Sequence, residues 1–232
     1  ALTTAGALVV VGAGFLGLEV AASACRRGVR TTVLEAAAGP LAGRLGLAVA
    51  EWLLDLHRRH GVDVRCGASV GGFVGHARLE GVALTDGRII DADAALVSVG
   101  SLPNVEWLAG SGLALDDGVV CDAWGRTSVP GIFAVGDVTR YVVPGEPSVR
   151  TEHWSGAVAH ARLVAENLLL PSERAMRPLS VVPYFWSDQF DHKLQVVGEW
   201  RPDLEERIVE GSVGDGRFGV VFEERGEVRA AA

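Results

Sequence analysis

The sequence predicts an α/β fold: a three-layer domain built on a parallel sheet, then a second domain, then a small β-rich unit. Apolar runs typical of buried strands alternate with helical patterns between residues 7 and 66, and a glycine-rich turn joins the first run to the first helix. Beyond residue 181, short alternating runs are separated by Gly-rich turns, which is typical of antiparallel strands.

Composition and charge narrow the function classes. The chain has 232 residues, 49% of them apolar and 22% charged, as in ordinary globular proteins of one or two domains. A net charge of -8 argues against a nucleic-acid-binding surface. The three cysteines have neither CxxC nor metal-type spacing, so we expect no metal site and no redox-active disulfide. Without an apolar run of about 18 residues or a signal peptide, we expect no membrane span and a cytoplasmic protein.

The first informative stretch reads strand, turn, helix, strand. Ala7–Val11 is an apolar run, Gly12-Ala13-Gly14-Phe15-Leu16-Gly17 follows it, and Thr31–Leu34 is the next run. Glycine serves a different need at each position of this motif: the first allows the tight turn, the second lets the backbone approach a pyrophosphate, and the third lets the helix pack closely on the strand. A phosphate would then lie at the helix N-terminus, where free N–H groups favour an anion.

An acidic residue strengthens this interpretation. Glu35 closes the second strand, at the offset of about 20 residues that a ribose-binding carboxylate has. A carboxylate accepts a hydrogen bond from a ribose 2′-hydroxyl and repels a 2′-phosphate, which favours NADH over NADPH. The stretch therefore predicts a Rossmann-like dinucleotide-binding domain. A glycine-rich turn without a ligand is the alternative.

The next segments complete this domain. Leu41–His60 has the apolar spacing of an amphipathic helix, and we expect His57 and His60 near its end to be solvated. Val62–Cys66 is the predicted third parallel strand. Residues 70–91 predict an inserted antiparallel meander with a hairpin at Asp86-Gly87, and residues 94–100, ending at Gly100, predict a further buried strand.

A second informative stretch is Ser128–Val138. It predicts a short buried strand ending in Gly136-Asp137, which would place a carboxylate at the C-terminal edge of a sheet, where ligands bind in open α/β folds. Asp137 could then accept a hydrogen bond from a polyol, and its alternative role is that of a turn or helix cap. After residues 151–154 we expect a helix. Its inward face should consist of Ala157, Val158, Ala161, Val164 and Leu168.

With these motifs the chain resembles the flavin-dependent, NADH-dependent ferredoxin reductases of the pyridine nucleotide-disulfide oxidoreductase superfamily, which serve ring-hydroxylating dioxygenase and cytochrome P450 systems. Four segments carry the resemblance, and Pro183–Phe190 is the most specific of them. The other three are residues 12–19, residues 127–137 and Glu152-His153-Trp154.

The resemblance implies NAD(H) and FAD as cofactors. It implies Glu19 near the nicotinamide, Asp137 on the ribityl chain, and Trp154 and Trp186 at the isoalloxazine edge, although each tryptophan alone is also typical of a core. The full set of cofactor-binding candidates is Gly12, Gly14, Phe15, Leu16, Gly17, Glu19, Glu35, Gly100, Gly136, Asp137, Glu152, His153, Trp154 and Trp186.

The resemblance also implies a reaction and a domain plan. Hydride would pass from NADH to FAD, and electrons would then leave singly to a [2Fe–2S] ferredoxin, so no catalytic side chain is expected. The expected domains are residues 1–101 for NADH, residues 102–178 as the later part of an FAD domain, and residues 179–232 as a truncated β-rich domain. Family members begin with an FAD-binding half, so we expect a partner chain or a further segment to complete the FAD site. The alternative is a noncatalytic dinucleotide-binding fragment or subunit.

Overall fold

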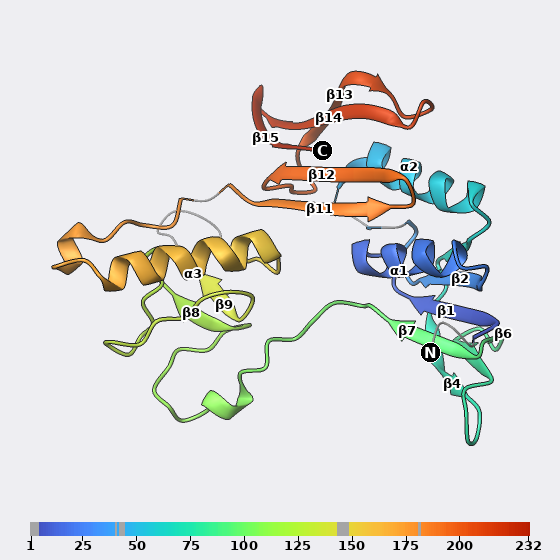
Figure 1. Cartoon of the computed structure of the whole chain (residues 1–232), viewed down its shortest axis with the longest axis horizontal. Coiled ribbons are helices and arrows are strands. Elements are labelled where there is room, and N and C mark those ends of the chain that lie inside the picture. Colours follow the sequence, from blue (N-terminus) through green and yellow to red (C-terminus); the bar gives the residue numbers. More distant parts are fainter. Residues whose placement is uncertain (1–4, 40, 42–44, 143–148, 181) are drawn as a thin grey trace. The chain divides into compact units, whose positions relative to one another are not determined.

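The computed structural model describes residues 5–39, 41, 45–142, 149–180 and 182–232. Contacts between residues divide the chain into two compact units, one formed by Ala1–Gly100 with Trp186–Ala232 and the other by Ser101–Phe185. Figure 1 shows the path of the chain through both units. The three-domain division expected from the sequence stays a prediction.

A four-stranded parallel sheet is the centre of the first unit. Its order is β3-β2-β1-β7, and its strands are β1 (Ala7–Val11), β2 (Arg30–Glu35), β3 (Asp63–Cys66) and β7 (Ala94–Val97). Helix α1 (Phe15–Cys25) joins β1 to β2, and helix α2 (Gly46–Arg59) joins β2 to β3. The strands and helices predicted for this region are confirmed, although α2 begins at Gly46 and not at Leu41, which lies in a turn.

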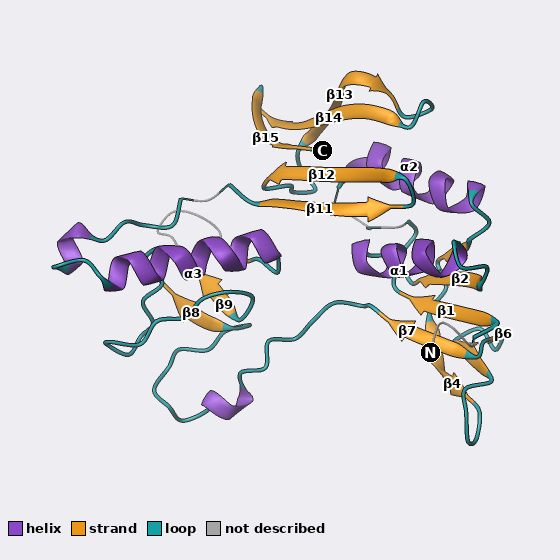
Figure 2. Ribbon diagram, in the orientation of Figure 1, coloured by secondary structure: helices purple, strands orange, loops and turns teal. Residues whose placement is uncertain are grey.

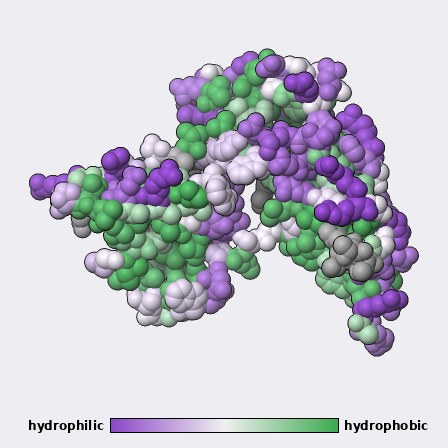
Figure 3. Space-filling view, in the orientation of Figure 1, coloured by the Kyte–Doolittle hydropathy of each residue, from purple (hydrophilic) through white to green (hydrophobic). Residues whose placement is uncertain are grey.

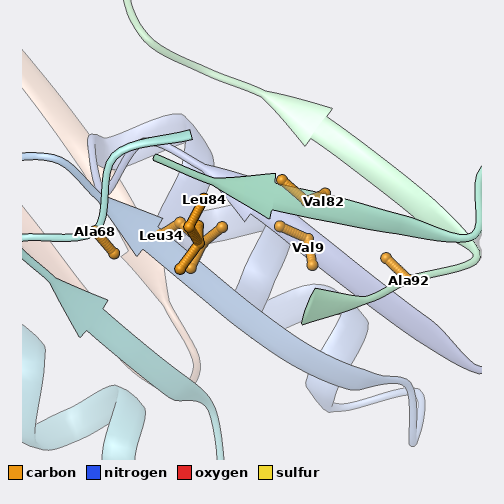
Figure 4. Close-up of a cluster of buried hydrophobic side chains, with 6 residues drawn as sticks. All are labelled: Val9, Leu34, Ala68, Val82, Leu84 and Ala92. Carbon is orange, nitrogen blue, oxygen red and sulfur yellow. The ribbon is translucent and has the colours of Figure 1, made fainter. Parts of the chain in front are cut away.

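Two layers cover opposite faces of this sheet. Val10 faces α1, because a Cβ added to Gly17 would lie 3.2 Å from the Val10 Cγ1 atom. The neighbouring Val9 faces the other way, as alternation along a strand requires. It packs with Leu34, Val82 and Leu84 in a buried cluster with Ala68 and Ala92 (Figure 4).

The second of these layers is the predicted meander. It consists of β4 (Val70–Val74), β5 (Gly81–Leu84) and β6 (Ile89–Asp91), which pair antiparallel in the order β4-β5-β6. The three-layer architecture is therefore confirmed. One expectation about it is wrong: β7 is an edge strand of half-exposed residues and is not buried, because among the described residues only β1 pairs with it.

The C-terminal residues form a five-stranded sheet in the order β11-β12-β15-β14-β13 (Figure 2). Its strands are β11 (Tyr184–Gln189), β12 (His192–Gly198), β13 (Glu205–Ser212), β14 (Arg217–Glu224) and β15 (Glu227–Ala231). Strands β13, β14 and β15 pair antiparallel, and their turns lie at the predicted Gly-rich positions.

Strand β13 supplies the N-terminal cap of α2. The helix follows Leu45, whose side chain cannot accept a hydrogen bond, and the two oxygens of the Glu206 carboxylate accept from the backbone amides of Leu47 and Ala48 at 2.8 and 2.9 Å. A carboxylate at this end also meets the positive end of the helix dipole. The contact fastens the C-terminal sheet to α2.

We expect Glu206→Ala to lower the free energy of unfolding by about 1–2 kcal/mol, the usual worth of a charged N-terminal cap. Urea denaturation followed by circular dichroism measures this change. Glu205→Ala, on the same strand and exposed, is the matched control. An equal loss in both variants would contradict the capping role.

The second unit, Ser101–Phe185, is mostly loop around a small sheet (Figure 2). The sheet has the order β10-β9-β8, formed by β8 (Val119–Cys121), β9 (Thr139–Tyr141) and β10 (Val149–Arg150). Two short 3-10 helices, Glu106–Leu108 and Glu173–Ala175, and helix α3 (Trp154–Leu168) complete the unit. Its core gathers Val119, Cys121 and Tyr141.

Two expectations about this unit are wrong. Residues 132–135 form no strand, because the only pairing described there is an isolated bridge between Arg126 and Phe133. Helix α3 buries Gly156, His160, Val164 and Asn167, so of the expected inward face only Val164 is buried. Apolar residues lie at the surface of the unit (Figure 3). They include Leu168 at the end of the helix and Leu169 after it, which are both exposed.

Candidate functional site

At the glycine turn between β1 and α1, the backbone of Gly12 passes close to the backbone of two neighbouring segments. Gly12 has a φ of +100°, and its amide donates to the Leu34 carbonyl at 2.8 Å. A Cβ at this position would lie 2.2 Å from the Ser98 carbonyl oxygen, closer than any side chain tolerates. Gly12 is therefore needed by the protein itself, to pass between β2 and the residue that follows β7.

Gly17 and Gly14 have different reasons to be glycine. A Cβ on Gly17 would lie 2.3 Å from the Gly12 carbonyl oxygen, so its absence lets α1 lie against the turn. Gly14 has an ordinary backbone conformation, with φ of −76° and ψ of 173°, and a Cβ there would meet nothing within 4 Å. No contact in the described part of the chain requires this glycine, so its backbone is open to close approach by a ligand.

The N-terminus of α1 is open to an anion. Within the described stretch 5–39, Gly14 makes no side-chain cap and the first turn holds no acidic residue. The first amides of a helix and its dipole favour a negative charge at such an end. Leu16 in this turn is 70% exposed, and Phe15 is half-buried.

The carboxylate of Glu35 reaches the same turn from the end of β2. Its Oε2 accepts from the Ala13 amide at 2.8 Å, and its Oε1 accepts from the Ala37 amide at 2.9 Å. A carboxylate has about four lone-pair positions, so both oxygens keep capacity to accept from a ribose hydroxyl. The sequence predicted the position of Glu35 but not these two backbone contacts, which make it part of the turn.

Three more of the predicted residues belong to the first unit. Glu19, on α1, is half-buried and its Oε1 accepts from the Ser187 hydroxyl at 2.6 Å and from the Asp188 amide at 3.1 Å. Gly100 follows β7 with a φ of +104°, and a Cβ there would meet nothing within 4 Å. Trp186, on β11, is 41% exposed and belongs to the same unit.

The remaining predicted residues lie in the second unit. Gly136 has a φ of +80° and Asp137 is exposed. The expectation that they end a strand is wrong, because they precede β9 and the Gly136 carbonyl accepts from the Thr139 amide in a turn. His153 precedes α3 and His160 lies on it. The negative charge of Asp137 favours the protonated forms of both histidines, so its carboxylate faces that helix.

Three predicted residues gather at the start of α3. Glu152 accepts hydrogen bonds from the Ser101 hydroxyl and from the Arg150 guanidinium; burial alone would raise the pKa of this carboxyl, but the two bonds outweigh it and the pKa lies below its ordinary value. His153 occupies the N-cap position, with its ring 4.5 Å from the ring of Phe185. Trp154 begins the helix and is 73% exposed, as a residue that stacks on a ligand would be.

Buried histidines are a feature that the sequence did not reveal. His57 is fully buried, with its Nε2 atom 2.9 Å from the Gln189 Oε1 atom, so the expectation that it is solvated is wrong, whereas His60 is exposed. His160 is also buried, with its ring 4.3 Å from that of Tyr141. Burial is the main cause that lowers the pKa of His57 and of His160, and it likewise lowers the pKa of His153.

We expect acid to destabilise the protein from just below neutral pH. A histidine with a lowered pKa binds its proton in the unfolded chain first, at about pH 6.5, so the free energy of unfolding falls as the pH drops below that value. For each such histidine, the free energy of unfolding can fall by at most about 1.4 kcal/mol per pH unit. Urea denaturation between pH 7.5 and 5 measures it.

The variant that isolates one histidine is His57→Gln, which keeps a donor for Gln189. It should show a shallower fall than the unmodified chain. His76→Gln, at an exposed position, is the matched control and should keep the original pH dependence. Identical pH profiles for the two variants would show that His57 is not one of the titrating groups.

No group of three or more His, Cys, Asp or Glu side chains in the described ranges is placed to hold a metal ion. Among the helices that the structure describes, none combines the length and the apolar character needed to cross a membrane.

Comparisons with known proteins agree with this geometry. Residues 2–161 match the model of the pyridine nucleotide-disulphide oxidoreductase family, and residues 184–232 match a reductase C-terminal model. Rhodocoxin reductase from Rhodococcus erythropolis is 38% identical over 221 residues, 94% of this chain and 51% of the relative. Terpredoxin reductase from a Pseudomonas species is 37% identical over 218 residues, 92% of this chain and 52% of the relative.

Solved structures give the same picture. The ferredoxin reductase for the CYP199A2 system from Rhodopseudomonas palustris matches with a TM-score of 0.91 and 32% identity, covering 99% of this chain and 56% of that one. The reductase in the covalent putidaredoxin reductase–putidaredoxin complex matches with a TM-score of 0.88 and 33% identity, covering 97% and 54%. The chain thus spans about half the length of the relatives it matches. From its matched residues and its glycine turn, the chain belongs to the pyridine nucleotide-disulphide oxidoreductase family.

Proposed function

We propose that the protein binds NADH at the glycine turn and acts as the NADH-binding part of a flavin-dependent ferredoxin reductase. The observation that carries the proposal is the contrast within the motif: Gly12 and Gly17 are required by close backbone contacts, whereas Gly14 borders open space at an uncapped helix end. A ligand phosphate explains why Gly14 is glycine. Glu35, held beside it, would accept from the adenosine ribose.

Residues of the second unit support the proposal that this unit contacts the flavin end of FAD. The exposed Asp137 would accept from the ribityl hydroxyls, and the exposed ring of Trp154 would cover one face of the flavin. The His153 Nδ1 atom is buried and has no hydrogen-bond partner among the described residues, so a bound polar group could satisfy it. Gly100, Gly136, Glu152 and Trp186 remain proposed contacts of the two cofactors.

The chemistry proposed for the chain is electron transfer. When bound, NADH and FAD supply hydride transfer and single-electron chemistry to a [2Fe–2S] ferredoxin. This chain's own residues would orient the rings and exclude water, and no side chain need form a covalent bond. The relatives named after rhodocoxin, terpredoxin and putidaredoxin support a ferredoxin as partner.

A partner chain or further segment is proposed to complete the FAD site, because the matched relatives are about twice as long as this chain. The three cysteines are free, which suits the reducing cytoplasm that we propose as its location. A second candidate function is a noncatalytic NADH-binding subunit. The observation that favours it is that the glycine turn and Glu35 are complete within the first unit.

One experiment separates these functions. The purified chain is examined for a flavin absorption spectrum and for bleaching by NADH under anaerobic conditions. Bleaching supports the reductase, whereas a colourless protein whose melting temperature NADH raises supports the binding subunit. Colour and ferredoxin reduction that return only with an added FAD-binding segment support a site shared between chains. A colourless chain that NADH does not stabilise contradicts both functions.

A further inference from the structure

A buried chain of hydrogen bonds runs from the end of α2 to the first turns of α1. The His57 Nε2 atom lies 2.9 Å from the Gln189 Oε1 atom, and the Gln189 amide nitrogen donates to the Ser187 hydroxyl at 2.8 Å and to the Phe15 carbonyl at 3.4 Å. The Ser187 hydroxyl in turn donates to the Glu19 carboxylate at 2.6 Å. The three central side chains are 0% exposed: His57, Ser187 and Gln189.

The direction of every bond in this chain is determined. The Phe15 carbonyl can only accept, so the Gln189 amide group faces it and the Gln189 oxygen faces His57. His57 must then donate from Nε2, which leaves its Nδ1 atom without a proton in the neutral ring. That Nδ1 atom is buried without a hydrogen-bond partner in the described part of the chain. A neutral His57 in one tautomer is thus part of the arrangement.

The turn after β11 is fastened to the same two helices. Phe190 stacks on His60 with ring centroids 3.8 Å apart and meets the edge of His57 at 5.0 Å. Its backbone has a φ of +56°, and its carbonyl accepts from the Arg26 guanidinium at 3.0 Å. Strand β11 is therefore joined to α1 at both ends of the helix, and to the end of α2.

We propose that Gln189 is a positioning residue for the dinucleotide site, coupling β11 to the phosphate-binding end of α1 through Phe15 and Glu19. The inference rests on the proposed binding of NADH at Gly14. Phe15 directly follows that glycine, so a bond that holds the Phe15 carbonyl also holds the amides offered to the pyrophosphate. Because coupling between two sites is reciprocal, a bound dinucleotide should in turn reduce the local opening of β11.

The test compares Gln189→Met with Gln195→Met. Methionine matches glutamine in size but cannot donate to Phe15 or Ser187, and Gln195 is exposed on the neighbouring strand β12. NADH affinity is measured by fluorescence titration on the full-length chain, with folding verified by circular dichroism. We expect Gln189→Met to bind NADH about fivefold to tenfold more weakly, and Gln195→Met to bind it normally. Ser187→Ala, a smaller change, provides a second variant with a weaker effect in the same direction.

Hydrogen exchange distinguishes positioning from a purely structural role. In the unmodified chain, NADH should slow the exchange of the β11 amides, including Asp188, and leave the β13–β14 hairpin unchanged. In Gln189→Met this slowing should be lost although the protein remains folded. Equal NADH affinity in the two methionine variants, or equal slowing in Gln189→Met, overturns the inference alone. Failure of the unmodified chain to bind NADH overturns the proposed function and the inference with it.

Discussion

Gly17→Ala is expected to lower the free energy of unfolding by about 3 kcal/mol, the upper range for an overpacked core position. Its new Cβ would lie 2.3 Å from the Gly12 carbonyl oxygen, and backbone cannot move aside as a flexible side chain can. Either α1 or the strand end must shift, so NADH affinity should fall together with stability. Urea denaturation and NADH titration on the same preparation measure both.

Gly14→Ala is the matched control for this substitution. Its Cβ meets nothing within 4 Å and its backbone conformation suits alanine, so the loss of stability should not exceed about 1 kcal/mol, the usual cost of alanine at an N-cap. NADH affinity should still fall, by about tenfold or more, because the added methyl group occupies the space assigned to the pyrophosphate. If Gly14→Ala binds NADH as well as the unmodified chain does, the ligand does not lie where we propose.

The second large effect concerns the choice between NADH and NADPH. Glu35→Arg should reverse the preference, because the carboxylate that repels a 2′-phosphate is replaced by a guanidinium that attracts it. We expect the ratio of the two affinities to change by about a hundredfold or more. Parallel titrations with NADH and NADPH measure the ratio directly, independently of any change in the amount of folded protein.

Glu35→Arg should also destabilise the glycine turn. Both Glu35 oxygens accept from backbone amides, those of Ala13 and Ala37, so its loss also loosens the turn. Glu35→Gln is the control: it keeps one acceptor oxygen and the size of the side chain, so it should weaken NADH without creating a preference for NADPH. Equal affinity of the unmodified chain for the two cofactors would contradict the role assigned to Glu35.

Much of the first unit could be predicted from the sequence, because local patterns determine it. Val9 and Val10 belong to one continuous apolar run, as a strand buried on both faces requires, and the structure places them on opposite faces of the sheet. The hairpin at Asp86-Gly87 likewise depends on neighbouring residues alone, with the Arg88 amide donating to the Asp86 carboxylate at 3.0 Å. Such short-range rules hold regardless of the rest of the fold.

The burial of His57 could not be predicted, since its partner Gln189 is 132 residues away in the sequence. A histidine near the end of an amphipathic helix is typical of a solvated position, and only the docking of β11 changes this. The same holds for Asn167 on α3, which is buried because its side chain bonds the backbone of Arg177 in both directions at 2.9 Å. A returning chain segment, and not helical periodicity, decides which face of α3 is inward.

For the candidate site, the sequence indicated the residue types and the Glu35 carboxylate. It did not indicate the structural contacts that the site residues also make within the protein. The resemblance implies that Glu19 lies near the nicotinamide, which stays a prediction. Its contacts with Ser187 and Asp188 show a further role, in joining α1 to β11. Pairs so distant in sequence leave no local pattern, so the contacts that organise the candidate site emerged only from the fold.

The edge position of β7 has a consequence for how the chain behaves at high concentration. One side of this strand offers backbone groups that no other described strand pairs with, and Val97 and Val99 nearby are 55% and 69% exposed. An apolar edge of this kind is a template on which a second copy can add its own strand. We therefore expect self-association through β7 at high concentration, and a gatekeeper charge such as Val97→Lys should suppress it.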